Sequence, residues 1–568
     1  MAASKESFEI QVFQTDHWVT SAQAGTEREA QKIAAEKMAN PGVGGIRIVR
    51  EWVGLGGREN TKVIHEQMKE AAKDDTVRPS AIEEAAWCDT ADELVLAPAR
   101  LAISRVLRQW LDKQTLTPTE LIYNFRELKK AMDYETLVPA SVGKIAAIHA
   151  RDRKEDQQKR NARLWDLIND MAARIREANQ RQDLPEIKDT VTLTQAWAQL
   201  QRAGDRRGLY GRVVLARKLT NDRSWLGKLE WLLAEVEKTQ DAELLRLLDE
   251  PIADLCTPPE AMRDLLGRQP DLARAMITLI ELVEGRLKAD GDVIPSVTET
   301  LSRLCNNPSL PETRTALLTF LSRQLGGRQK LTFGSDDNQS AAYRDLIAKL
   351  MRPTGFGGGP EVAAAVALGY QRFVAEGGQT GRRNAVMQSC RMFESLCHRV
   401  IFICSLLDSA LGKEFEKDLL TRLDDVMAAG NSMDAITPPK LAPHLRLSHL
   451  TGAWRSIQAQ AAVPDARRER YVTQLAGFQD GFLAQTKLLD RLDDGAQPLR
   501  LRVLKLAQLA ASGALFGAAR QELQARLTAH TNRGDFSTAF TADLATPEEK
   551  QKALASVQAT LRQVATAG

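Results

Sequence analysis

The chain has 568 residues, of which 43% are hydrophobic and 27% are charged, and its formal net charge is +3. This length can bury several cores, and the composition is that of a folded globular protein rather than a disordered one. The near balance of 77 basic and 74 acidic residues argues against a general binder of nucleic acids, which needs a concentrated basic face.

A cytoplasmic location is predicted from the start of the chain, its hydropathy and its cysteines. The first ten residues, MAASKESFEI, contain no apolar segment of the kind found in signal peptides. The most apolar run, residues 400–407, is far shorter than the roughly 18 residues of a membrane span, so insertion into a membrane is not expected. The six cysteines are scattered, unlike a disulfide framework. Arg outnumbers Lys, and Ala and Leu are abundant, which favours a GC-rich bacterial source.

Residues 1–56 are predicted to form a small ββαβ module. Phe8, Ile10 and Val12 alternate with polar residues, the pattern of a strand with one buried face. A returning strand follows a polar turn, and Thr26 with Glu29, three residues later, predicts a capped helix that ends at the sequence NPG. A third strand follows the helix. The module is small enough that we expect it to pack on a neighbour.

His17 and Trp18 lie at the turn of this predicted hairpin. Trp18 and Trp52 are expected either to pack on the module's single helix or to leave aromatic surface exposed beside the turn. Tryptophan is enriched at positions that dominate protein interfaces. His17 and Trp18 are therefore candidate interaction residues.

The rest of the chain is predicted to be helical. Residues 57–92 are interpreted as a linker with one helix at 62–72, residues 93–352 as an all-α array, and residues 361–568 as its continuation. Apolar residues recur every three to four positions, and Gly, Pro, Asn and Asp mark short connections. Since no repeat of fixed length is found, an irregular α-solenoid and consecutive helix bundles both stay open.

Two helix starts carry the same local signature. The sequences TPPE at 257–260 and SLPE at 309–312 each place a hydroxyl residue three positions before a glutamate, with proline in the first turn. This is the pattern of a capping box, in which the hydroxyl side chain accepts from a backbone amide of the first turn. Both helices are therefore expected to be capped by their own Thr or Ser.

The glycine-rich sequence GFGGGPE at 355–361 precedes a predicted helix, so it fits either a phosphate-binding loop or a flexible hinge. Pro360 removes one backbone donor, and Glu361 would repel an anion. The hinge is the favoured interpretation.

The densest run of charges, RDRKEDQQKRNAR at 151–163, admits two interpretations. Asp156 and Arg160 are spaced for an i,i+4 pair on a solvated helix. Contact with nucleic acid is the alternative, but no aromatic residues are interleaved to stack on bases. The solvated helix is favoured.

Five residues between 390 and 404 form the second candidate interaction site. Cys390, Phe393, Cys397, Val400 and Cys404 follow an alternating 4-3 spacing on a predicted helix over residues 382–411. Cysteines seven residues apart are separated by about 10.5 Å along a helix, so they cannot share one zinc ion. The spacing predicts an apolar seam, which is buried either within the chain or against a second copy as a homodimer.

No catalytic residue, cofactor site or metal site is assigned. The sequence contains neither HExxH nor GxSxG, and its seven histidines form no cluster. His444 and His449 do not share a helix face, and His398 points about 100° away from Cys397. A non-enzymatic cytoplasmic scaffold or adaptor that presents an extended helical surface to other proteins is the favoured function. The alternative is an enzyme or ligand-responsive regulator with a pocket between helices.

Overall fold

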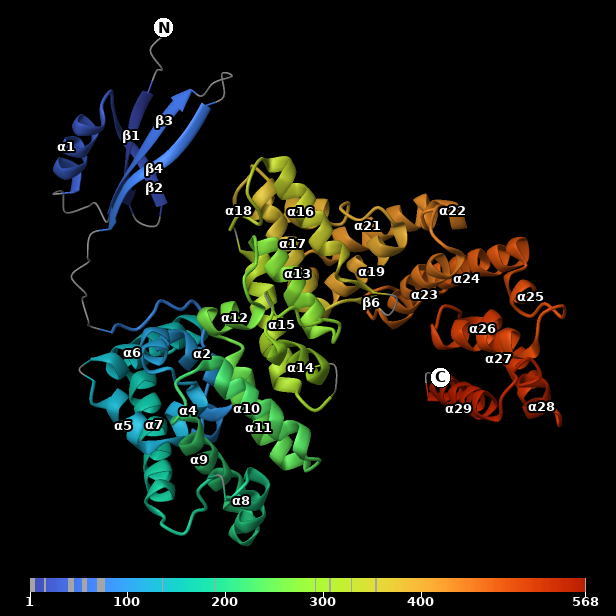
Figure 1. Cartoon of the computed structure of the whole chain (residues 1–568), viewed down its shortest axis with the longest axis horizontal. Coiled ribbons are helices and arrows are strands. Elements are labelled where there is room, and N and C mark those ends of the chain that lie inside the picture. Colours follow the sequence, from blue (N-terminus) through green and yellow to red (C-terminus); the bar gives the residue numbers. More distant parts are fainter. Residues whose placement is uncertain are drawn as a thin grey trace. The chain divides into compact units, whose positions relative to one another are not determined.

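The structure is a computed structural model of the chain (Figure 1). It describes residues 6–14, 17–38, 45–53, 59–68, 77–134, 136–188, 190–291, 293–305, 308–327, 329–352 and 355–566. The chain divides into two compact units, Met1–Pro79, here called the sheet unit, and Ser80–Gly568, here called the helical unit. The boundary between them lies within the predicted linker 57–92.

The sheet unit contains a four-stranded antiparallel sheet in the order β2-β1-β3-β4, with one helix (Figure 1). Its elements are β1 (Glu6–Gln14), β2 (His17–Ala24), α1 (Glu27–Met38), β3 (Gly45–Val53) and β4 (Glu59–Met68). The predicted hairpin, helix and third strand are confirmed. The Glu29 amide donates to Thr26 Oγ1, and the Glu29 carboxylate accepts from the Gly25 amide, so the predicted cap forms.

The core of the sheet unit lies between α1 and one face of the sheet. Successive side chains of a strand point to opposite faces, so Phe8, Ile10 and Val12 share one face. These side chains pack with Ala30 and Ala34 of α1, and all five are buried.

The prediction of a helix at 62–72 is wrong, because residues 59–68 form β4. β4 pairs along β3 and satisfies backbone groups that would otherwise be left open at the edge of the sheet. Residues 69–72 of the predicted helix lie outside the described residues.

The helical unit is mainly α, as predicted. Its first half contains η1 (Ala91–Val95), α2 (Ala97–Val106), α3 (Arg108–Gln114), α4 (Pro118–Tyr123), α5 (Phe125–Met132), α6 (Leu137–Arg153), α7 (Gln157–Gln180), α8 (Leu193–Gln199), η2 (Leu200–Arg206), α9 (Arg207–Leu219), α10 (Trp225–Lys238), α11 (Ala242–Leu255), α12 (Pro259–Leu266), α13 (Leu272–Val283), α14 (Ser296–Cys305), α15 (Pro311–Gly326) and α16 (Asp336–Ala348). Its second half contains β5 (Met351–Arg352), β6 (Gly355–Phe356), α17 (Gly359–Gly369), η3 (Tyr370–Phe373), α18 (Gly378–Ser389), α19 (Leu396–Leu407), α20 (Ala410–Glu414), α21 (Glu416–Ala429), α22 (Met433–Ile436), α23 (Pro443–Ala459), α24 (Asp465–Thr486), α25 (Leu488–Leu492), α26 (Leu499–Ala511), α27 (Gly517–Thr531), α28 (Phe536–Phe540) and α29 (Pro547–Thr566).

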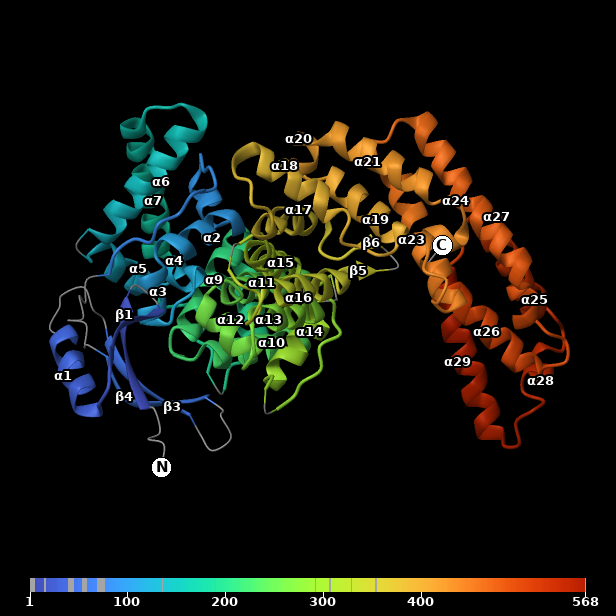
Figure 2. The ribbon, with the colours of Figure 1, turned by 90° about the horizontal axis from the view of Figure 1, so that it is seen from above.

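Helices of this unit pack both on the next helix in the chain and on helices several elements away. α6 lies beside α7, α11 beside α15, and α19 beside α23 (Figures 1 and 2). One hydrophobic core extends through the unit from Ala91 to Val557. Two smaller clusters near α6 and α7 are separate from it.

The predicted continuous helix over residues 382–411 is wrong. α18 ends at Ser389 and α19 begins at Leu396, and the turn between them folds Phe393 inward, 5.0 Å from the Phe402 ring. Arg399 donates to the Phe393 carbonyl. The 4-3 spacing did not reveal the break because the turn residues Cys390 and Phe393 are as buried as the helical ones.

The glycine-rich sequence at 355–361 forms strand β6 and the start of α17 rather than an open hinge. Phe356 is buried with its ring 5.4 Å from that of Phe402. Gly358 and Gly359 adopt positive φ angles of 78° and 72°, which only glycine adopts readily. The glycines therefore serve a tight turn in the core.

Candidate functional site

The candidate site is built on the antiparallel pair α6 and α7. Lys154 ends α6 in a left-handed conformation, with φ of 55°, and Asp156 caps α7 by accepting from the Lys159 amide at 2.7 Å. The charged run 151–163 therefore spans a turn rather than one solvated helix. The i,i+4 pair predicted for Asp156 and Arg160 is wrong, because Asp156 is the cap.

Residues 80–89, here called the docked segment, lie along this helix pair and adopt neither helix nor strand. Five of the segment's backbone carbonyls accept hydrogen bonds, at 2.6–3.4 Å, from side chains of α6 and α7. The accepting carbonyls are those of Ser80, Glu83, Ala86, Cys88 and Asp89, and the donors are Lys144, Arg151, His149, Arg160 and Arg163, respectively. Such contacts bind a backbone and impose little demand on its sequence.

Trp87 anchors the docked segment. The guanidinium groups of Arg153 and Arg160 lie 3.9 and 3.6 Å from its ring centroid, which is cation–π geometry. The ring of His149 lies 5.0 Å away, and the indole N–H donates to Asp89 at 2.7 Å. A ring in contact with two arginines is a strong local contact, although the sequence pattern predicts that Trp87 lies in a linker.

His149 and Arg160 connect the docked segment to the protein interior. Arg160 is 2% exposed and donates to Nδ1 of His149 at 3.0 Å. The ring proton of His149 therefore lies on Nε2, which donates to the Ala86 carbonyl. Burial and the positive charge of Arg160 lower the pKa of His149, so the ring stays neutral.

A cavity of about 140 Å³ lies beneath the docked segment, between α2, α4, α5, α6 and α7. Its walls are apolar except for Cys88, Ser141 and His149. Five small side chains leave much of the space unfilled. They are Ala85, Ala86, Ala99, Ala102 and Ala131.

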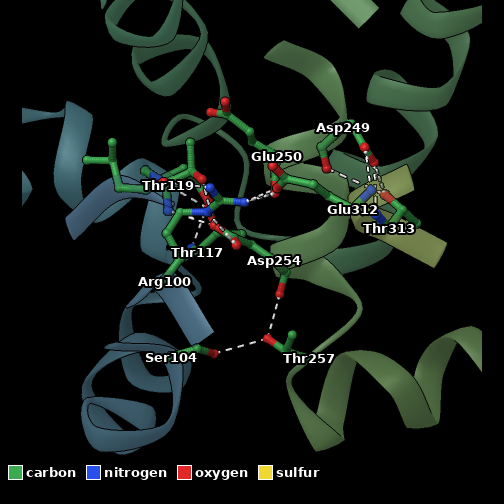
Figure 3. A network of polar contacts seen from close by, with 12 residues as sticks. Arg100, Ser104, Thr117, Thr119, Asp249, Glu250, Asp254, Thr257, Glu312 and Thr313 are labelled. Carbon is green, nitrogen blue, oxygen red and sulfur yellow. Dashed lines mark hydrogen bonds and ion pairs between the residues drawn. The ribbon is translucent and has the colours of Figure 1, made fainter. Parts of the chain in front are cut away.

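A buried polar network connects α2 and α4, which line this cavity, to α11 and α15 (Figure 3). Arg100 of α2 is 2% exposed and forms ion pairs with Asp254 of α11 at 3.0 Å and with Glu312 of α15 at 2.6 Å. Asp254 also accepts from the amide and hydroxyl of Thr119 at the start of α4. Other side chains of α2 and α4 line the cavity. The network therefore holds these two walls to the main core.

The protonation of Arg100 follows from its neighbours. Burial by itself would lower its pKa, but the carboxylates of Asp254, Glu312 and Glu250 outweigh burial and raise it. The guanidinium also donates to the carbonyls of Val95 and Glu250. Arg100 therefore stays protonated, and its N–H groups donate to acceptors in η1, α11 and α15.

The network also replaces the predicted local cap of α15. Asp249 of α11 accepts from the amides of Glu312 and Thr313 at 2.7 and 2.9 Å, and from the Thr313 hydroxyl at 2.6 Å. The N-cap residue of α15 is Leu310, and its apolar side chain cannot accept a hydrogen bond from the first turn. The capping box expected at 309–312 is therefore wrong.

The second predicted capping box, at 257–260, is also not formed. α12 begins at Pro259, and its N-cap position is Pro258, which has no side-chain oxygen. The Thr257 hydroxyl instead donates to the Asp254 carbonyl at 2.8 Å and lies 3.0 Å from the Ser104 hydroxyl of α2. Tertiary contacts compete successfully with the local cap.

Asp249 predicts a measurable pH dependence of stability. Burial raises its pKa to about 6, against the opposing effect of its hydrogen bonds. Between the unfolded value of about 4 and this value, the folded chain holds more protons, so this group's contribution to stability falls as pH rises. We expect the wild type to lose stability relative to Asp249→Asn from pH 4 to 6, by about 1.4 kcal/mol per unit of pKa shift. Urea midpoints of both proteins at several pH values test this, and a constant difference would contradict it.

The two sets of sequence-predicted interaction residues lie in different surroundings. The side chain of His17 is outside the described residues. Trp18 is partly buried, 5.3 Å from the Phe13 ring, with Arg47 4.7 Å above it. Phe13 follows Val12 in β1, so this aromatic pair lies on the sheet face opposite α1. The expected packing of Trp18 on α1 is therefore wrong.

The five residues of the predicted seam lie in the core of the helical unit. Cys390, Cys397 and Val400 are fully buried, and Phe393 and Cys404 are 4% and 3% exposed. Burial raises the pKa of Cys390 to about 12 and also raises those of Cys397 and Cys404, so the thiols are neutral. At neutral pH they behave as small apolar side chains.

This burial leads to a prediction for Cys397. Cys397→Glu places a carboxylate against apolar neighbours and is expected to lower the free energy of unfolding by several kcal/mol, whereas Cys397→Ala is mild. Thermal unfolding together with light scattering tests this. For a seam inside one chain, the melting temperature falls and no smaller species appears. A folded, stable monomer derived from a wild-type dimer would instead indicate a homodimer seam.

Two histidines that sequence reasoning treated separately face each other. The rings of His398 on α19 and His449 on α23 are 4.2 Å apart. Burial lowers the pKa of both, that of His398 to about 4 with a further contribution from His449. No local signal joins residues so far apart in the chain. Among the described residues, no group of three or more His, Cys, Asp or Glu side chains is placed to hold a metal ion.

Comparison of the chain with protein-family models, with curated proteins and with solved structures gives no match. In the part of the chain that the structure describes, no helix is both long and apolar enough to cross a membrane. The geometry of the docked segment and the cavity therefore carries the functional inference.

Proposed function

We propose that this protein is a non-enzymatic scaffold or adaptor that acts in the cytoplasm and binds other proteins on its helical surface. The observation that carries this proposal is the docked segment. Side chains of α6 and α7 hold a backbone that is neither helix nor strand through five of its carbonyls, and Arg153 and Arg160 both contact the ring of its tryptophan. Helical surfaces with arginine and aromatic anchors bind extended segments in this way.

The chemistry of the cavity supports a binding role over an enzymatic one. Acid–base catalysis needs titratable groups that can exchange protons with a substrate. His149 is neutral with both ring nitrogens engaged, and burial raises the pKa of the Cys88 thiol to about 11. Neither group is suited to proton transfer or nucleophilic attack at neutral pH.

A ligand-responsive regulator is the second candidate function, and the apolar cavity is the observation that favours it. The docked segment forms part of the cavity wall through Ala85, Ala86 and Cys88. A molecule in the cavity would therefore contact the segment that α6 and α7 hold. Binding of a ligand and binding of a protein are compatible in one chain.

The scaffold function is tested by the size of the complex that the chain forms in its native cell. We expect a complex that is larger than the 62.8 kDa chain. This complex contains another protein in fixed stoichiometry and re-forms from purified components. The variant Arg151→Gln/Arg163→Gln lacks two of the side-chain contacts from α6 and α7 to carbonyls of the docked segment. Comparing its complex with that of the wild type tests whether the partner binds at this surface. A chain that migrates at its own mass in fresh extract, and forms no complex with co-purified candidates, would contradict the proposal.

A further inference from the structure

The cavity lies where the packing of the helical unit is discontinuous. Three separate hydrophobic clusters meet there: the main core, a cluster of α6 and α7 around Val142, Ala146 and Leu164, and a cluster of Cys88, Ala99 and Leu167. Protein interiors are close-packed, and voids larger than a water molecule are few. A cavity of about 140 Å³ is many times larger than the roughly 10–15 Å³ that a cavity needs to hold one water. Left empty, such a space is destabilising.

The polar groups of the cavity wall are already engaged within the protein. The Ser141 hydroxyl donates to the Leu137 carbonyl at 2.7 Å, and both ring nitrogens of His149 have protein partners. The thiol of Cys88 is directed at the Ala86 carbonyl, 3.7 Å away. A buried water needs two to four polar partners, and a charged ligand needs a counter-ion, and these walls offer neither.

Two walls of the cavity are held in fixed positions, which defines its shape. α2 and α4 are tied to α11 and α15 by Arg100, Asp254 and Thr119, which are all buried. The cavity cannot close by a shift of these helices without breaking buried ion pairs and hydrogen bonds. The remaining walls are α5, α6, α7 and the docked segment.

We propose that this cavity binds one small, uncharged, apolar molecule, such as a single aromatic ring or an alkyl group of similar volume. An apolar cavity of about 150 Å³ is large enough for benzene. Recognition rests on shape and on the removal of apolar surface from water, because the donors of the polar wall groups are already engaged within the protein. The inference specifies the ligand of the second candidate function, and its test does not depend on whether the chain is a scaffold.

The test uses the full chain and two fluorinated probes followed by ¹⁹F relaxation. Fluorobenzene is expected to bind, and 4-fluorobenzoate is not, because its carboxylate would be buried without a partner. Ala131→Leu fills the space from α5 and is expected to abolish fluorobenzene binding. Ala102→Leu fills it from α2 and serves the same purpose if the first variant does not fold.

Ala146→Leu is the matched control. Ala146 is fully buried in the cluster of α6 and α7 but does not line the cavity, so this variant is expected to lose stability and keep fluorobenzene binding. The proposal is overturned if the wild type does not bind fluorobenzene, if it binds 4-fluorobenzoate equally well, or if either cavity-filling variant folds and binds as the wild type does. Failure of both variants to fold would mean that no space is available, and would overturn it as well.

Discussion

Replacing Arg100 with Met is expected to lower the free energy of unfolding of the helical unit by about 3–5 kcal/mol. The substitution keeps a similar apolar volume but leaves Asp254, which is 5% exposed, without its cation. It also removes the donors to the carbonyls of Val95 and Glu250. An unpaired buried charge costs far more than a surface ion pair contributes.

Urea unfolding followed by the helical circular dichroism signal measures this effect. Arg100→Lys is the graded control, because it keeps the charge but cannot reproduce the planar set of donors. We expect its midpoint to lie between those of the wild type and Arg100→Met. Equal midpoints for Arg100→Met and the wild type would show that the network contributes nothing to stability.

Replacing Lys228 with Met is expected to be similarly damaging, by about 3–5 kcal/mol, for a related reason. Lys228 of α10 and Glu120 of α4 form an ion pair at 2.7 Å, and both side chains are fully buried. Burial raises the pKa of Glu120 and lowers that of Lys228, so each group depends on the other to stay charged. The single substitution leaves Glu120 as an uncompensated buried acid.

The double variant Glu120→Gln/Lys228→Met separates the charge effect from general loss of packing. Gln keeps an acceptor for the Thr117 amide, which donates to Glu120 at 2.8 Å, and carries no charge. A buried ion pair can often be replaced by neutral groups at little cost. Urea midpoints are therefore expected to rank wild type and double variant above Lys228→Met. A double variant as unstable as the single one would contradict the argument.

The docked segment shows how residues of the candidate site escape prediction. Residues 57–92 are polar and rich in breaks, which predicts a linker, and the run 151–163 by itself predicts a solvated helix. Each interpretation considered one stretch alone. Arg160 contacts Trp87 and Cys88, which lie more than 70 residues earlier. The apolar sequence AAWC within a supposed linker was the signal that could have indicated a packed segment.

What the sequence determined by itself is the type of most elements. The alternation in β1 and the three-to-four spacing in the helices follow from the geometry of the backbone, so they can be read from a few neighbouring residues. The cap of α1 by Thr26 is local in the same sense, because its donor lies three residues away. These features required no knowledge of distant contacts.

The tertiary structure alone decided the rest. β4 exists because β3 offers it backbone partners, and α15 is capped by Asp249, more than 60 residues earlier, rather than by its own sequence. The cavity results from small side chains on elements that only folding brings together. Hydrogen bonds and apolar contacts between distant segments have free energies as large as those of local caps and spacings. Where the two compete, as at the start of α15, the distant partner prevails because it satisfies two backbone amides and a buried hydroxyl at once.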